Sequence, residues 1–91
     1  MKRSRLDICI DVLQVIKRGC CKPTRIMYRS NISWIPLREI LSFLISQGAV
    51  TVRNSGEKRK EYYITEKGRN ILKYYEQFKA ILTERTGSLP E

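Results

Sequence analysis

The sequence contains no histidine and only three cysteines among its 91 residues. Without histidine there is no imidazole for acid–base catalysis or metal ligation, and three thiols alone make a poor zinc site. An odd number of cysteines is not typical of a disulfide-bonded domain. Glycine-rich phosphate loops and carboxylate pairs placed for acid–base chemistry are also missing. The sequence therefore predicts a protein that is not an enzyme, has no metal site and uses no cofactor.

The three cysteines fall into two kinds of environment. Cys9 lies on the apolar face of a predicted helix and is expected in the core. Cys20 and Cys21 are adjacent and follow Gly19 in a predicted turn. A redox switch or vicinal disulfide at this pair is an alternative to two inert thiols.

Long apolar runs are missing too. None approaches the roughly 18 residues that a membrane-spanning helix needs. The basic N-terminus is followed by Asp7 and Asp11, a pattern unlike that of a signal peptide. We therefore expect a cytoplasmic protein without a membrane partner.

Acidic residues are scarce, with nine Asp and Glu against 18 Lys and Arg, and the net charge is +9. The excess lies in two blocks. Residues 1–29 hold eight Lys/Arg against two Asp, and residues 53–60 hold four Lys/Arg against one Glu. Segregated positive charge attracts phosphate more strongly than evenly spread charge does. These blocks are therefore predicted to bind duplex DNA, in preference to the alternative that they only form a solvated surface.

Apolar periodicity and capping residues predict a mainly α fold with a small β-hairpin. In the hairpin, Val50, Val52 and Tyr63 are expected to share a buried face, with Ile64 as a further candidate. This order of elements is that of a winged helix-turn-helix, with the hairpin as the wing. The predicted helices cover residues 4–17, 23–29, 33–47 and 65–86, and the strands 51–53 and 60–64 flank a turn at 54–56.

The last predicted helix is too long for the small core of such a domain. Its apolar residues step by four, three and four, which is the spacing of a coiled-coil seam. The sequence therefore predicts a DNA-binding domain over residues 1–68 and a homodimerisation helix with a frayed tail over 69–91; a helix that folds back on its own domain is the alternative. The expected interface residues are Ile71, Tyr74, Tyr75, Phe78, Ile81 and Leu82.

The expected DNA contacts come from four parts of the chain. Arg38 is the one strong hydrogen-bonding reader of guanine on the helix over 33–47, so we expect weak sequence preference. Outward Ile35 and Phe43 suggest a protein-docking patch instead, which is the alternative function. The candidate DNA-binding residues are Lys2, Arg3 and Arg5 in the N-terminal arm, Arg25 and Arg29, then Ser33, Trp34, Arg38 and Ser42, and Arg53, Lys58, Arg59 and Lys60 in the wing.

Several short stretches resemble one known family. They are Asn31-Ile32-Ser33-Trp34, the apolar positions Leu37, Leu41 and Leu44, Gly48-Ala49-Val50, and Tyr63-Ile64-Thr65-Glu66-Lys67-Gly68. From Asn31 onward the chain resembles the small archaeal winged-helix family that includes the ArnR-like regulators and the ten-kilodalton chromatin proteins of Sulfolobus. The resemblance implies double-stranded DNA binding and an antiparallel coiled-coil dimer through the last helix. We therefore expect a transcriptional regulator or a nucleoid-associated protein, with a winged-helix protein–protein interaction module as the alternative.

Overall fold

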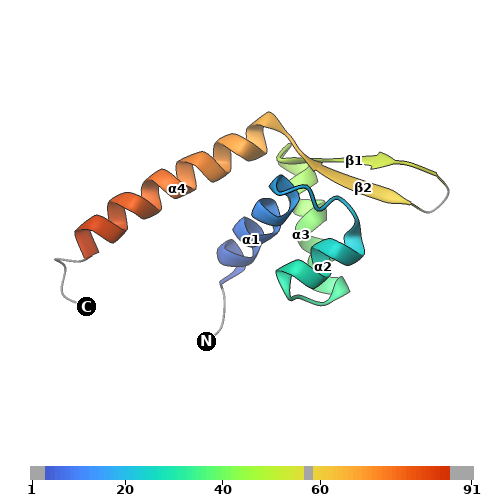
Figure 1. Ribbon diagram of the computed structural model, residues 1–91, viewed down its shortest axis with the longest axis horizontal. Helices are drawn as coiled ribbons and strands as arrows, with labels where there is room; N and C mark the ends of the chain where they lie inside the picture. The colour runs from blue at the N-terminus through green and yellow to red at the C-terminus, as the bar shows by residue number, and fades with distance from the viewer. Residues whose placement is uncertain (1–3, 57–58, 87–91) are drawn as a thin grey trace.

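A computed structural model describes residues 4–56 and 59–86, with no description of the side chains of 83–86. The mainly helical fold with a two-stranded wing, predicted from the sequence, is confirmed. The molecule is elongated, with extents of 54 × 28 × 20 Å, because the hairpin and the last helix leave the central helices in opposite directions (Figure 1). The elements in chain order are α1 (Arg5–Lys17), α2 (Pro23–Ser30), α3 (Trp34–Ser46), β1 (Val50–Asn54), β2 (Lys60–Ile64) and α4 (Glu66–Thr86).

Helix α1 runs through the middle of the domain. Ser4 caps it as predicted: the Asp7 amide donates to Ser4 Oγ at 3.1 Å, and the Ser4 amide donates to Asp7 Oδ2 at 3.2 Å. Cys9 is buried as expected, and Val12 and Leu13 are almost fully enclosed. The remaining core comes chiefly from α2, α3 and the start of α4, through Ile26, Leu37, Ile40, Leu41, Leu44 and Leu72.

A tight turn joins α2 to α3. Its residue Asn31 has a left-handed backbone with φ of 56°, a conformation that asparagine tolerates better than most residues do. The Asn31 amide donates to the carbonyl of Tyr28 at 3.3 Å, and the Ile32 amide donates to Met27 at 3.4 Å. These bonds close the end of α2, so that α3 begins after Ser33 as predicted.

The wing corrects one prediction. Val50 pairs with Ile64 and Val52 pairs with Tyr62, so these four side chains share a face of the hairpin. Tyr62 is the buried tyrosine, 7% exposed, whereas Tyr63 is 37% exposed. Val52 is 40% exposed as well, so the prediction that Val52 and Tyr63 are buried was wrong. Two adjacent tyrosines leave the strand register ambiguous by one residue, and such a slip exchanges the two faces.

A compact junction joins α3, the wing and α4. The Thr65 hydroxyl donates to the carbonyl of Gly48 and accepts a bond from the Gly68 amide at 3.1 Å. The Thr65 amide donates to the carbonyl of Ala49 at 3.0 Å. Thr65 is thus the N-cap of α4, as predicted, and it also ties that helix to the end of α3.

Removal of this hydroxyl is expected to destabilise the fold. Thr65→Ala loses the α4 cap and the bond to Gly48, which should lower the free energy of unfolding by about 1–2 kcal/mol. Urea unfolding followed by circular dichroism measures this change. Thr65→Ser keeps the hydroxyl and should recover most of the loss; equal stability of the alanine variant and the wild type would contradict the role of the cap.

Candidate nucleic-acid interface

A hollow lies between α3 and the wing. Its volume is about 530 Å³. Trp34, Arg38 and Ser42 are spaced four residues apart on α3, so they lie in a row on the side of the helix that borders it. Lys60 at the start of β2 and the buried Tyr62 form the wall opposite. The hairpin therefore makes the outward face of α3 one side of a groove.

A second hollow adjoins the first and extends it along the wing. It is lined by Lys22 and Thr24 at the start of α2 and by Arg59 and Glu61 of the wing, and it shares Pro23 and Lys60 with the first hollow. Together they form one continuous surface, which we call the α3–wing face. It is built mainly from Lys22, Trp34, Arg38, Ser42, Arg59 and Lys60.

The α3–wing face is suited to a polyanion. Among the described residues that line its two hollows, five carry charge, and of these only Glu61 is acidic. Lys22 precedes α2, whose N-terminus has no side-chain cap. Open amides at a helix N-terminus favour an anion, and Lys22 adds to that attraction. Sequence reasoning missed Lys22; the available signal was its position just before the helix-starting Pro23.

The structure brings only some of the predicted DNA-binding residues together. Trp34, Arg38, Ser42 and Lys60 line one hollow and Arg59 the next. Ser33 lies at the start of α3, in a groove beside Tyr28 and Trp34. Lys2, Arg3 and Lys58 lie outside the described residues.

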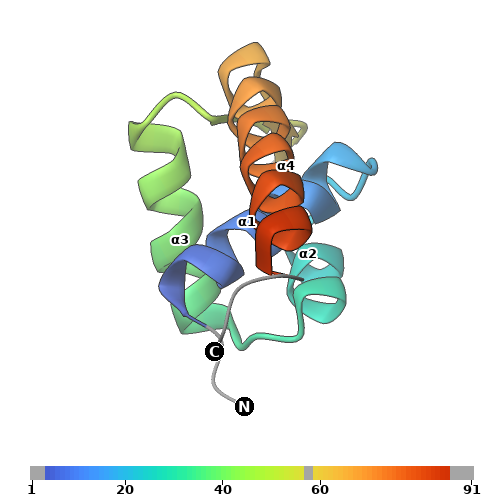
Figure 2. The same ribbon diagram turned by 90° about the vertical axis from the view of Figure 1, so that its left-hand side faces the viewer.

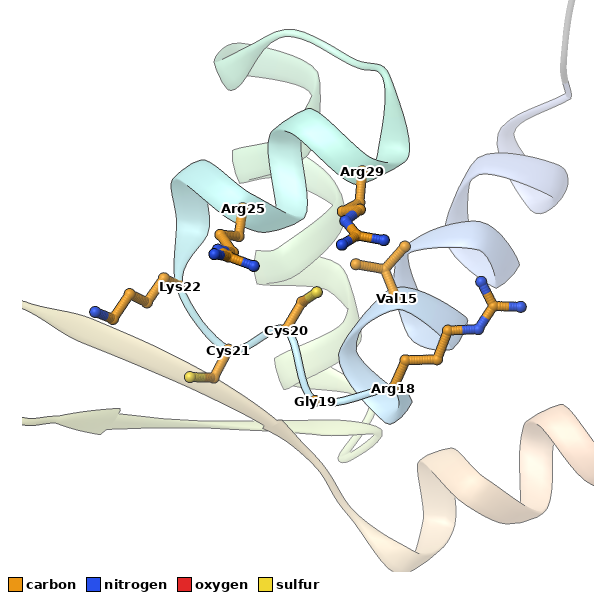
Figure 3. Close-up of a pocket in the computed structure, with 8 residues that line it drawn as sticks. All are labelled: Val15, Arg18, Gly19, Cys20, Cys21, Lys22, Arg25 and Arg29. Atoms are coloured by element: carbon orange, nitrogen blue, oxygen red, sulfur yellow. The ribbon is translucent and has the colours of Figure 1, made fainter.

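The other predicted contacts lie elsewhere. Arg53 is on the opposite face of the hairpin, with its guanidinium 5.4 Å from the centre of the Tyr63 ring. Arg5 begins α1, at the end of that helix far from the wing (Figure 1). Arg25 and Arg29 of α2 border a cleft on the side of the domain away from α3 (Figures 2 and 3).

The tyrosines of the wing have raised pKa values. Burial raises the pKa of Tyr62, and the positive charge of Arg38 acts in the opposite direction. A hydrogen bond from its hydroxyl to Glu61 Oε1, 2.8 Å long, is the main cause that raises the pKa of Tyr63 to about 12. Both side chains are therefore neutral near pH 7, and neither adds negative charge to the wing.

The described residues contain no cluster of three or more His, Cys, Asp or Glu that could hold a metal ion. No helix within 4–56 and 59–86 is long and apolar enough to cross a membrane. Cys9, Cys20 and Cys21 are free thiols.

Comparison with known proteins agrees with this geometry. The model of a winged helix-turn-helix family matches residues 2–83 of the chain. The protein belongs to this family. The family predicted from the sequence is confirmed by a match that covers the hairpin, the helices before it and most of α4.

Two archaeal relatives of this winged-helix protein are informative. An uncharacterized protein of Methanocaldococcus jannaschii is 32% identical over 70 residues, which are 77% of this chain and 67% of the relative. The crystal structure of Sso10a-2, a DNA-binding protein from Sulfolobus solfataricus, superposes with a TM-score of 0.80 at 28% identity. That match covers 94% of this chain and 88% of Sso10a-2.

Bacterial winged-helix structures share the fold at lower identity. A PadR family transcription regulator from Clostridium difficile has a TM-score of 0.80 at 16% identity and covers 89% of this chain and 95% of its own. FabT of Streptococcus pneumoniae, solved in complex with DNA, has a TM-score of 0.69 at 18% identity, over 91% of this chain and 61% of FabT. At these identities the likeness concerns the fold alone.

Proposed function

We propose that this winged-helix protein binds double-stranded DNA through its α3–wing face and acts as a transcriptional regulator. The observation that carries the proposal is the placement of Arg38, Ser42 and Lys60 around one hollow between α3 and the wing. DNA binding by the archaeal relative Sso10a-2 supports it.

The proposed contacts divide between bases and phosphates. Helix α3 enters the major groove, where the Arg38 guanidinium donates two hydrogen bonds to O6 and N7 of a guanine. Ser42 and Trp34 lie on the same face and contact the groove edge. Lys22, Arg59 and Lys60 bind phosphates on either side and set the register without reading sequence.

We further propose a homodimer through α4, paired as an antiparallel coiled coil. The first part of the predicted seam, Ile71 and Tyr75, packs against the protein's own core. Other residues of the predicted interface are exposed, with Tyr74 at 67% and Phe78 at 60%. Ile81 and Leu82 continue this apolar face, which a second copy of the helix would cover.

The level of sequence preference separates two forms of this proposal. A regulator binds selected operators, whereas a nucleoid-associated chromatin protein in the cytoplasm binds most duplexes with similar affinity. One base-reading arginine on α3 favours modest preference. Titration of random-sequence and selected duplexes at equal salt concentration gives the specificity ratio that decides between them.

The first experiment is a fluorescence-anisotropy titration of a random duplex at several salt concentrations, with light scattering on the same sample. We expect micromolar or tighter binding at low salt that weakens steeply as salt is added. No binding at low salt would contradict the proposed function.

Charge reversal in the wing should flatten the salt dependence. Arg59→Glu with Lys60→Glu removes two phosphate contacts, so the slope of log K against log salt should fall by about 2 in magnitude. The matched control is Arg69→Glu with Lys73→Glu, an equal charge change on the exposed side of α4 opposite Phe78. An equal fall in the control would mean that net charge, and not the wing, determines the slope.

A protein-docking module is the second candidate function. Ile35 is 70% exposed and Phe43 is 46% exposed, so the wing does not cover Phe43. Neither residue lines the hollows of the α3–wing face. Replacement of both by serine should leave the affinity for duplex DNA unchanged if DNA binding is the function.

A further inference from the structure

A second cationic surface lies on the other side of the domain from α3. It is a cleft of about 610 Å³ between the end of α1, the loop that follows it and α2 (Figure 3). Figure 2 shows α3 on one side of the molecule and the loop between α1 and α2 on the other. The residues that form the cleft include Val15, Arg18, Cys20, Lys22, Arg25 and Arg29.

The lining of the cleft is cationic, and Figure 3 shows Arg25 and Arg29 turned into it while Arg18 and Lys22 extend away from it. Four of its lining residues are Arg or Lys, and none of the lining residues in the described part of the chain is acidic. Arg25 and Arg29 lie one turn apart on α2, and both guanidinium groups extend toward the loop (Figure 3). Like charges at this proximity repel one another, and a bound anion would relieve that repulsion.

The walls of the cleft are fixed by backbone hydrogen bonds. The loop turns at Gly19, whose φ of 105° suits glycine. The Cys20 amide then donates to the carbonyl of Val15 at 3.3 Å, and the Tyr62 amide of β2 donates to the carbonyl of Cys21 at 2.8 Å. The loop is thus held between α1 and the wing, so the cleft is largely formed before any ligand arrives.

The chemistry of the lining indicates the class of ligand. A guanidinium group matches the spacing of two phosphate or carboxylate oxygens, and hydrogen bonds between charged partners are the stronger kind. The volume lies within the range of small-molecule sites. Val15 and the Cys20 thiol add a less polar wall beside the arginines (Figure 3).

We propose that this cleft binds a small molecule bearing two or more phosphate charges, at a site that shares Lys22 with the α3–wing face but is otherwise formed by other residues. The site does not require the proposed DNA binding. A flanking DNA phosphate has the same chemistry, so the test must separate a free phosphate compound from the duplex backbone.

The probe is inorganic pyrophosphate, added to the full-length ¹⁵N-labelled protein at constant ionic strength maintained with sodium chloride. We expect saturable amide shifts in residues 19–29. Arg25→Gln and Arg29→Gln should each weaken binding about tenfold or more, because each loses a charge-assisted hydrogen bond. Arg38→Gln, on α3, is the matched control and should change the pyrophosphate affinity less than about twofold, because Arg38 is not one of the residues that line the cleft.

Two results would overturn the proposal. In the first, pyrophosphate shifts the amides of α3 and the wing as strongly as those of residues 19–29, or the control loses as much affinity as the α2 variants. In the second, Arg25→Gln and Arg29→Gln weaken the binding of duplex DNA as much as the binding of pyrophosphate. This would assign the cleft to the DNA backbone. The duplex affinity of Arg38→Gln tests the proposed DNA binding separately.

Discussion

Replacement of Gly68 by alanine is expected to destabilise the protein by about 3 kcal/mol or more. A Cβ at this position would overlap the carbonyl oxygen of Ala49 and lie 2.7 Å from Cγ1 of Ile64. The obstacle includes backbone, so a rotamer change cannot relieve it. Glycine-to-alanine changes inside helices usually stabilise a protein by up to about 1 kcal/mol. A loss of stability on Gly68→Ala would therefore be evidence for the close contact at the junction.

Chemical denaturation at a fixed protein concentration measures this effect, because dimerisation would make stability depend on concentration. Asn70→Ala, at an exposed position two residues further along α4, is the matched control and should be nearly neutral. A Gly68→Ala variant as stable as the wild type would show that α4 can move away from Ala49 at little cost.

Two acidic substitutions on α4 are expected to abolish dimerisation. Phe78→Glu with Leu82→Glu places two like charges on each of two facing helices and removes apolar area that the pairing would bury. Light scattering should then report a monomer. Because two linked domains bind adjacent DNA sites with a high effective concentration, duplex affinity should fall about 100-fold or more.

The control carries equal charge on other faces of the helix. Lys73→Gln with Ala80→Glu makes the same change of two in net charge, at exposed positions on the side of α4 opposite the seam. We expect it to remain dimeric. If the Phe78 and Leu82 variant also stays dimeric, α4 is not the interface and its exposed apolar face needs another explanation.

Much of the fold could be predicted because local signals coincide with it. Ser4 and Thr65 are helix caps, and their hydroxyls act where the sequence places them. Gly48 follows α3 with a positive φ of 77°, as the end of a helix often requires. Each signal depends on residues within a few positions, so no knowledge of tertiary contacts is needed.

The candidate site was less predictable because it depends on contacts between distant residues. Tyr62 and Tyr63 can be told apart only by the pairing of β2 with β1. Arg25 and Arg29 share a helical face, but the sequence does not show that this face borders the end of α1. The spacing within a helix predicts which side chains neighbour one another, whereas the packing of helices decides what they surround.

Because α4 is anchored at its start, an insertion within the helix changes the direction in which its apolar face points. With the helix anchored at Thr65, one inserted residue before Phe78 would rotate the apolar face by about 100° and advance it by about 1.5 Å. Only insertions close to whole helical turns would keep that face in phase with the junction. If two copies pair through α4 as proposed, the spacing of their two DNA sites should therefore change in discrete steps with the length of α4.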